Sequence, residues 1–284
     1  MPSVAFMVLL AVTGFAANSV LARLALGTAA IDAAGYTGIR LLAGAVMLAL
    51  LAGRHRPLAL GRAVRTPARW ITAASLFGYA ITFSFAYQLL DTGTGALILF
   101  TTVQAGMLGW ALLKGDRPGP VALTGIAAAF GGFVYLVSPG LVAPHPLGAA
   151  LMIAAGLSWA VYSLVGRGSA EPLADTAYNF ILTAPLALGL LVVSLLYRAP
   201  DPIGVGWAVA SGALASGAGY AVWYKVLPLI SRSTAAIVQL LAPVIAAAGG
   251  VLLMGETVSL RLVVASLLIL GGVAVAIVFR RQAG

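Results

Sequence analysis

Apolar runs of about 20 residues follow one another along almost the whole chain, and short segments with proline, glycine or charge separate them. A helix needs about 20 apolar residues to cross the hydrocarbon core of a bilayer. The pattern therefore predicts ten membrane-spanning helices. We place them at 4–21, 33–51, 70–90, 94–113, 121–137, 147–165, 176–196, 205–226, 234–253 and 260–279.

The composition supports this interpretation. Hydrophobic residues make up 62% of the 284 positions and charged residues only 8%, whereas soluble domains carry about 25% charged residues. So few charges cannot cover a water-soluble surface, and we expect an all-α integral membrane protein whose outside faces lipid. The chain has no cysteine, which excludes disulfides, thiolate metal sites and cysteine nucleophiles.

Basic residues gather beside one set of predicted helix ends. Five arginines occupy the segment 54–69, between the second and third helices. Lys and Arg near helix ends are retained in the cytoplasm, and placing this segment inside puts twelve of the sixteen basic residues there. We therefore expect a multi-pass protein of the bacterial cytoplasmic (inner) membrane with both termini in the cytoplasm. The formal charge of +9 is scattered over these loops and does not indicate nucleic-acid binding.

The second half of the chain repeats the first. A shift of 140 residues lays the segment 94–116 over 234–256, where Gly115 meets Gly255 and an acidic residue follows in both copies. The same shift matches a Gly-Gly pair in the next helix, so the register persists.

This repeat predicts two units of five helices, at 1–140 and 141–284. Because five is an odd number, the second unit must enter the membrane from the opposite side, which makes an inverted-topology repeat. Two such units can exchange conformations and open a central site to one side and then the other. The repeat therefore predicts a transporter that works by alternating access.

Four stretches carry a resemblance to a known family: GFAANSVLAR at 14–23, RLLAGAVMLAL opening at Arg40, SWAVYSLVGR at 158–167 and LAPVIAAAGGVLLMGE at 241–256. In this order and spacing they resemble the drug/metabolite transporter superfamily, specifically its EamA type with ten helices in two halves. Val103 departs from the pattern, since many first halves carry a proline there. The segment TTVQ at 101–104 resembles the YddG-type branch, whose members export aromatic and other neutral amino acids and some cationic drugs.

Polar side chains at mid-depth are costly in lipid and indicate either function or hydrogen bonds between helices. Gln104 lies near the centre of its predicted helix, Gln239 nearer the cytoplasm, and Asn18 in the outer part of the first helix. Each either contacts substrate or binds a neighbouring helix, and Asn18 alternatively caps a helix break near Gly27. Thr101 and Ser163 complete the polar part of the predicted substrate-binding set.

Aromatic residues form the rest of this set. Those deep in the predicted third, sixth and eighth helices are Tyr79, Phe83, Trp159, Tyr162, Tyr220 and Trp223. A tyrosine hydroxyl in hydrocarbon needs a partner or a wet cavity. These rings either stack on a planar substrate and cover an ammonium group, or pack between helices.

Charged residues are scarce at mid-depth. Arg40 lies roughly 10 Å from the outer end of its helix at 1.5 Å per residue, and we expect a structural role in which it reaches outward or pairs with Asp32. All seven acidic residues fall in predicted loops or at helix ends. A proton-driven antiporter needs an ionisable group at mid-depth, so we hypothesise export without proton coupling.

The function hypothesised is export of small metabolites, above all neutral and aromatic amino acids. Alternatives are efflux of quaternary ammonium drugs, another metabolite carrier, and a lipid scramblase. Catalytic and nucleotide-binding motifs do not occur in the sequence, so we expect no enzyme, no catalytic residue, no metal and no cofactor. The expected partners are a small-molecule substrate and membrane lipid, with no nucleic acid, and we expect a monomer.

Overall fold

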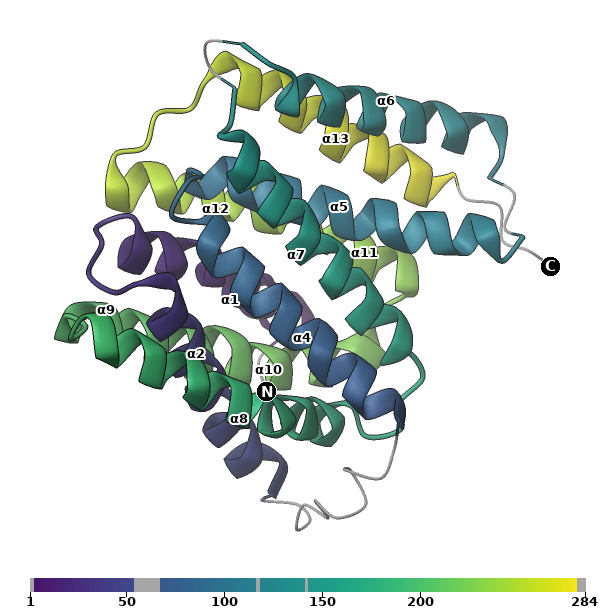
Figure 1. Ribbon diagram of the computed structural model, residues 1–284. Coiled ribbons are helices and arrows are strands. Elements are labelled where there is room, and N and C mark those ends of the chain that lie inside the picture. The colour runs from purple at the N-terminus through teal and green to yellow at the C-terminus, as the bar shows by residue number, and fades with distance from the viewer. Residues whose placement is uncertain (1–2, 54–66, 116–117, 141–142, 280–284) are drawn as a thin grey trace.

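The computed structural model describes residues 3–53, 67–115, 118–140 and 143–279, which form helices joined by short connections (Figure 1). Most of the basic loop 54–69, together with Asp116, lies outside the described residues. The helices are α1 (Val4–Leu26), α2 (Ala33–Gly53), α4 (Pro67–Ala86), α5 (Thr92–Leu113), α6 (Pro120–Val137), α7 (Pro146–Val165), α8 (Pro172–Tyr197), α9 (Pro202–Val209), η1 (Ala210–Ala218), α10 (Gly219–Val226), η2 (Leu227–Leu229), α11 (Arg232–Gln239), α12 (Leu241–Met254) and α13 (Leu260–Val278).

These elements make ten long rods within the described ranges, because α9, η1 and α10 form one continuous rod and α11 with α12 forms another. The prediction of an all-α protein with ten long helices is confirmed. The third predicted helix extends too far, since α4 ends at Ala86 and the residues 87–90 form a turn.

Nine of the rods in the described ranges are long and apolar enough to cross a membrane, and the remaining rod, α4, has 20 residues but is less apolar. This helix carries five hydroxyl side chains, and those of Thr82 and Ser84 are satisfied by its own backbone. The Thr82 hydroxyl donates to the Gly78 carbonyl at 2.7 Å, and the Ser84 hydroxyl donates to the Ala80 carbonyl at 2.8 Å. Such bonds let polar residues sit in a helix within lipid without an unpaired donor.

The ten rods pair as an inverted repeat requires. α2 packs on α8, α5 on α12 and α6 on α13, so corresponding helices of the two halves meet. The α2–α8 pair is antiparallel, because Gly35 lies against Ser194 while Gly44 lies against Phe180. The first and third rods of each half pack on each other across the two halves: α4 packs on α7, and α1 packs on η1 and α10. The boundary near residue 140 stays a prediction.

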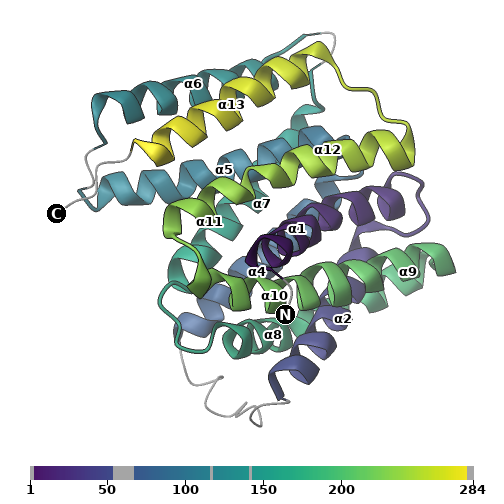
Figure 2. The same ribbon diagram turned by 180° about the vertical axis from the view of Figure 1, so that it is seen from behind.

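Small residues allow the α6–α13 pair to approach closely at one edge of the bundle (Figures 1 and 2). A Cβ atom added at Gly125 would lie 2.5 Å from the Gly272 carbonyl oxygen, and one added at Gly272 would lie 2.4 Å from the Gly125 oxygen. Glycine at both positions therefore lets the two backbones touch, which is how helices associate in lipid.

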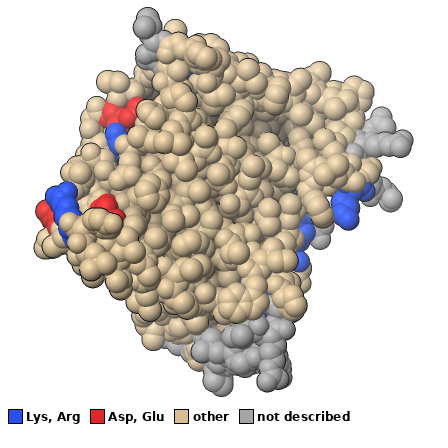
Figure 3. Space-filling model, viewed as in Figure 1, with Lys and Arg blue, Asp and Glu red and all other residues tan. Residues whose placement is uncertain are grey.

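Charged side chains on the face seen in Figure 3 gather at two opposite ends, and the broad area between them is uncharged. The six described acidic residues share this placement at helix ends: Asp32, Asp91, Glu171, Asp175, Asp201 and Glu256. The uncharged area between the two ends is the surface that lipid covers in a membrane protein. The bilayer normal therefore runs between the two charged ends.

Two of the rods are irregular in the second half. The eighth contains the π-helical segment η1, and the ninth breaks at Leu240 between α11 and α12. Pro243 explains the break, because it has no N–H to donate to the Gln239 carbonyl one turn earlier. α5, which carries Val103 at the position that corresponds to Pro243 under the 140-residue shift, is a continuous helix.

Candidate functional site

An aromatic cluster lies where α4, α7 and α10 meet. The Trp159 ring stacks on Tyr162 with centroids 4.9 Å apart and on Tyr220 at 5.8 Å, with interplanar angles of 20° and 14°. Tyr79 contacts Trp159 at 4.9 Å and Phe83 at 5.3 Å. The cluster therefore joins a helix of the first half to two helices of the second.

The cluster continues into α1 through Phe15, which the sequence analysis did not select. Phe15 lies 5.9 Å from Tyr220 and 5.5 Å from Trp223, measured between ring centroids. All six predicted aromatic residues thus belong to one connected set of rings, and their role in substrate binding stays a prediction. The sequence gave no signal for Phe15, because the predicted aromatic residues all lie on other helices, far from Phe15 along the chain.

Hydrogen bonds fix one edge of this aromatic cluster. The Tyr162 hydroxyl lies 3.4 Å from the Thr176 hydroxyl, which lies 2.9 Å from the Tyr224 hydroxyl. The Asn179 amide donates to Tyr162 at 3.4 Å and accepts from Thr72 at 2.9 Å. These bonds hold α4, α7, α8 and α10 together, so this edge is rigid.

Asn18 joins α1 to the π-helical segment. Its side-chain oxygen accepts hydrogen bonds from Ser211 at 2.8 Å and from Ser216 at 3.1 Å, and all three side chains are buried. α1 does end beside Gly27, but the Asn18 side chain binds these two serines and does not cap that end. Widened π turns are often found at functional sites, and here Asn18 ties that turn to the neighbouring helix.

The side chains of the other predicted polar residues form no hydrogen bond to the side chains of the aromatic cluster among the described residues. Gln104 is half-buried on α5, and its amide forms no hydrogen bond within the described residues. Gln239 donates to the Ala235 carbonyl at 3.1 Å, and Thr101 and Ser163 donate to carbonyls one turn earlier in their own helices. Their contact with substrate stays a prediction.

Arg40 is the residue whose surroundings the sequence analysis judged wrongly. Its side chain is only 2% exposed, and it neither reaches outward nor pairs with Asp32. The Asp32 carboxylate instead accepts from the Ala34 and Gly35 amides and from the Ser194 hydroxyl. A helix N-terminus attracts a carboxylate, which explains why Asp32 caps α2 instead of pairing with Arg40.

The contacts of Arg40 are with aromatic rings. Its Nη2 donates to the Tyr79 hydroxyl at 3.0 Å, and its guanidinium carbon lies 4.7 Å from the Phe83 centroid and 5.2 Å from that of Tyr79. A desolvated cation–π contact contributes about 2 kcal/mol, whereas removing an ion from water costs on the order of several kcal/mol. The rings thus offset only part of the cost. The sequence did hold one sign that Arg40 lacks a carboxylate partner on its own helix, because α2 contains no acidic residue.

An ion cluster ties four helix ends together on one side of the bundle. Glu256, which follows α12, accepts from Arg23 Nε at 3.1 Å and from the Thr92 N–H at 2.9 Å. Arg23 also donates to the Tyr87 carbonyl at 3.2 Å and lies 3.4 Å from the Asp91 carboxylate. We call Arg23, Asp91, Thr92 and Glu256 the Arg23 cluster. It holds the ends of α1, α4 and α12 to the start of α5.

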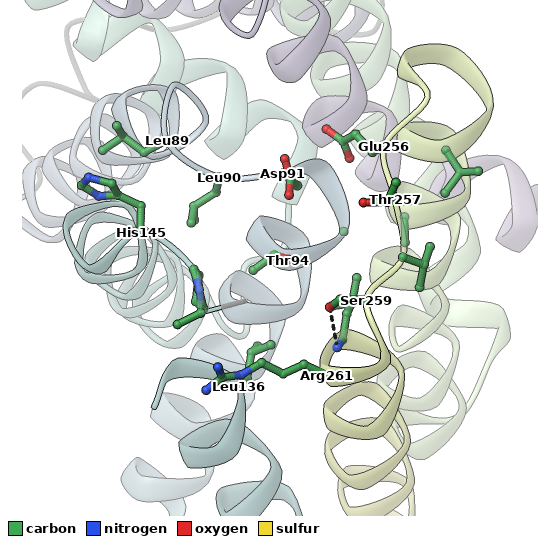
Figure 4. Close-up of a pocket in the computed structure, with 17 residues that line it drawn as sticks. Leu89, Leu90, Asp91, Thr94, Leu136, His145, Glu256, Thr257, Ser259 and Arg261 are labelled. Atoms are coloured by element: carbon green, nitrogen blue, oxygen red, sulfur yellow. Dashed lines mark hydrogen bonds between the residues drawn. The ribbon is translucent and has the colours of Figure 1, made fainter. Parts of the chain in front are cut away.

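A cavity of about 220 Å³ borders this cluster (Figure 4). Asp91 and Glu256 lie at one end of it, and Arg261 lies at the other. Arg261 donates to the Tyr135 carbonyl at 2.7 Å, so its charge is engaged with the end of α6. The cavity is lined by residues near helix ends at one charged end of the bundle, and no residue of the aromatic cluster lines it.

Comparison with known proteins agrees with this architecture. Residues 146–278 match the model of the EamA-like transporter family. The chain is 48% identical to an uncharacterized protein of Pseudomonas aeruginosa over 93% of this chain and 91% of the relative. It is 28% identical to the threonine/homoserine exporter RhtA of Salmonella typhimurium, over 81% of this chain and 76% of that protein.

A solved crystal structure shares the fold, with a TM-score of 0.64 at 24% identity, over 99% of this chain and 100% of the other. The family match, the relatives and the lipid-facing bundle of apolar helices point to the same kind of protein. The chain therefore belongs to the EamA-like transporter family of the drug/metabolite transporter superfamily, and at the level of that family it is a multi-pass membrane exporter of small metabolites.

Proposed function

We propose that this protein exports neutral amino acids, including aromatic ones, across the bacterial inner membrane. The observation that carries the proposal is the aromatic cluster at the junction of the two halves, where Trp159 stacks between Tyr162 and Tyr220. Aromatic rings pair favourably with other planar rings, stacked or edge to face, so an aromatic side chain of a substrate fits such surroundings. The relation to an exporter of threonine and homoserine supports an amino acid as the substrate class.

We infer that transport proceeds by alternating access between the two five-helix halves. The Arg23 cluster closes one end, which positive-inside reasoning assigns to the outside, with both termini in the cytoplasm. The π-helical segment and the break before Pro243 supply places where rods can bend, as discontinuous helices do in other transporters. The monomer is the proposed functional unit, since each chain holds both halves.

Proton coupling is not part of the proposal. The described carboxylates lie at helix ends and are engaged there, for example Glu256 with Arg23 and Asp175 with Arg69. Export would then follow the substrate gradient. Uphill transport by reconstituted protein under an imposed pH gradient would contradict this part.

The test is counterflow of labelled tryptophan into liposomes that hold the purified protein and unlabelled tryptophan. We expect protein-dependent uptake that unlabelled phenylalanine or threonine competes for, and uptake equal to that of empty liposomes rejects the proposal. Two other outcomes are informative: uptake of a quaternary ammonium dye without amino-acid transport indicates drug efflux, and lipid flipping alone indicates a scramblase.

A further inference from the structure

Unpaired polar atoms gather beside the aromatic cluster. The buried side-chain atoms without a hydrogen-bond partner in the described part of the chain include Arg40 Nη1 and the Tyr36 hydroxyl. Tyr36 is one turn before Arg40 on α2, and both side chains interact with Tyr79. A buried polar atom is normally paired, so two unpaired atoms one turn apart on α2, one of them on a cation, indicate a ligand.

The charge of this group sets the kind of ligand. A guanidinium keeps its proton in proteins, and no ion pair of the described residues includes Arg40. The ionisable side chains that interact with it are the tyrosines Tyr36, Tyr79 and Tyr220. The missing partner is therefore an anion, and one guanidinium matches a single negative charge.

The position of Arg40 connects it with the aromatic cluster. Its Nη2 donates to the Tyr79 hydroxyl, and the Tyr79 ring contacts Trp159 at 4.9 Å between centroids. Tyr79 alone therefore separates the guanidinium from the stacked rings. An aromatic amino acid presents a carboxylate two bonds away from the carbon that carries its ring. Arg40 with the Tyr36 hydroxyl offers donors for such a carboxylate.

We propose that Arg40 binds the carboxylate of the transported amino acid, so that substrates need a free carboxylate and cations without one are rejected. The inference rests on the proposed function and deepens it, because it selects amino acids over the quaternary ammonium drugs that an aromatic cavity alone would also accept. A buried cation repels a second cation, and water cannot screen that repulsion at this depth.

Competition on the unaltered protein tests the proposal first. Tryptophan counterflow is measured against indole-3-propionate, which keeps the carboxylate and lacks the ammonium, and against tryptamine, which keeps the ammonium and lacks the carboxylate. We expect indole-3-propionate to inhibit at least about 10-fold more strongly, as loss of one charge-assisted bond implies. Equal or stronger inhibition by tryptamine overturns the role of Arg40 and leaves amino-acid export standing.

Variants then separate binding from a structural role. Arg40→Gln should raise the half-inhibitory concentration of indole-3-propionate about 10- to 100-fold and leave that of tryptamine unchanged, and Arg40→Lys should restore part of the loss. Arg198→Gln is the matched control, because Arg198 is exposed after the end of α8. If Arg40→Gln changes both inhibitors by the same factor, Arg40 is structural and the proposal is wrong.

A binding readout covers failure of transport. If tryptophan counterflow is absent, the proposed function fails, and thermal unfolding in detergent tests the site itself. Indole-3-propionate should stabilise the unaltered protein and Arg198→Gln, whereas its amide should not, and Arg40→Gln should lose the effect. No stabilisation of the unaltered protein, or the same stabilisation of Arg40→Gln, overturns the proposal.

Discussion

If transport follows the alternating access proposed above, replacing Glu256 by glutamine is expected to weaken closure at the Arg23 cluster. The carboxylate accepts from Arg23 Nε at 3.1 Å, from the Thr92 N–H at 2.9 Å and from the Thr92 hydroxyl at 3.0 Å. Glutamine keeps the shape but removes the charge that faces the guanidinium and the positive end of the α5 dipole. The Glu256 side chain is only 12% exposed, so water screens these interactions little.

The size of the effect follows from this geometry. A hydrogen bond to a charged group contributes about 1.5–3 kcal/mol, which corresponds to a shift of about 10- to 100-fold in the equilibrium between closed and open. Asp91 supplies the matched control, because its side chain is 64% exposed and lies 3.4 Å from Arg23. An exposed ion pair contributes at most about 1 kcal/mol, so Asp91→Asn should shift the equilibrium less than about fivefold.

The assay uses the absence of native cysteines. A single Ser19→Cys change places a thiol on α1 at a position that is 1% exposed. Its rate of reaction with a membrane-impermeant maleimide reports opening at this end. We expect Glu256→Gln to raise the rate about 10- to 100-fold. Equal rates in Glu256→Gln and Asp91→Asn would refute the reasoning that the Glu256 carboxylate holds this end closed.

Three further predictions concern packing and binding. Gly125→Ala should lower the free energy of unfolding by about 1–3 kcal/mol, because the new Cβ would lie 2.5 Å from the Gly272 oxygen. Its control is Gly131→Ala, whose Cβ meets no atom within 4 Å and which should leave thermal unfolding unchanged. Asn18→Leu should cost about 1–3 kcal/mol by removing the acceptor of two buried serines of η1, and an unchanged melting temperature in detergent would contradict that role. Trp159→Leu should raise the half-saturating concentration of tryptophan about 2- to 10-fold and leave that of threonine nearly unchanged in competition assays, so an equal change for both would count against stacking.

The helices and their order were determined by the sequence alone. Whether a run of residues crosses a membrane depends on its own length and apolar content, which are local properties. The same holds for the repeat, since α5 begins at Thr92 and α11 at Arg232, which preserves the 140-residue shift seen in the chain. Boundaries were less certain: α4 ends at Ala86, before the predicted 90, and α1 continues to Leu26, beyond the predicted 21. The turn after Ala86 contains Leu89 and Leu90, which an apolar run does not distinguish from helix.

The composition of the site was decided by tertiary structure. The way α1 crosses the eighth rod brings Phe15 between Tyr220 and Trp223. The same crossing lets Asn18 bind two serines of η1. The surroundings of Arg40 depend in the same way on α4, which brings Tyr79 and Phe83 to it while Asp32 stays at the helix end. A long apolar run predicts that a helix lies in lipid. The distance between side chains of different helices is set by the crossing angle and the rotation of each helix, and no local sequence pattern encodes these.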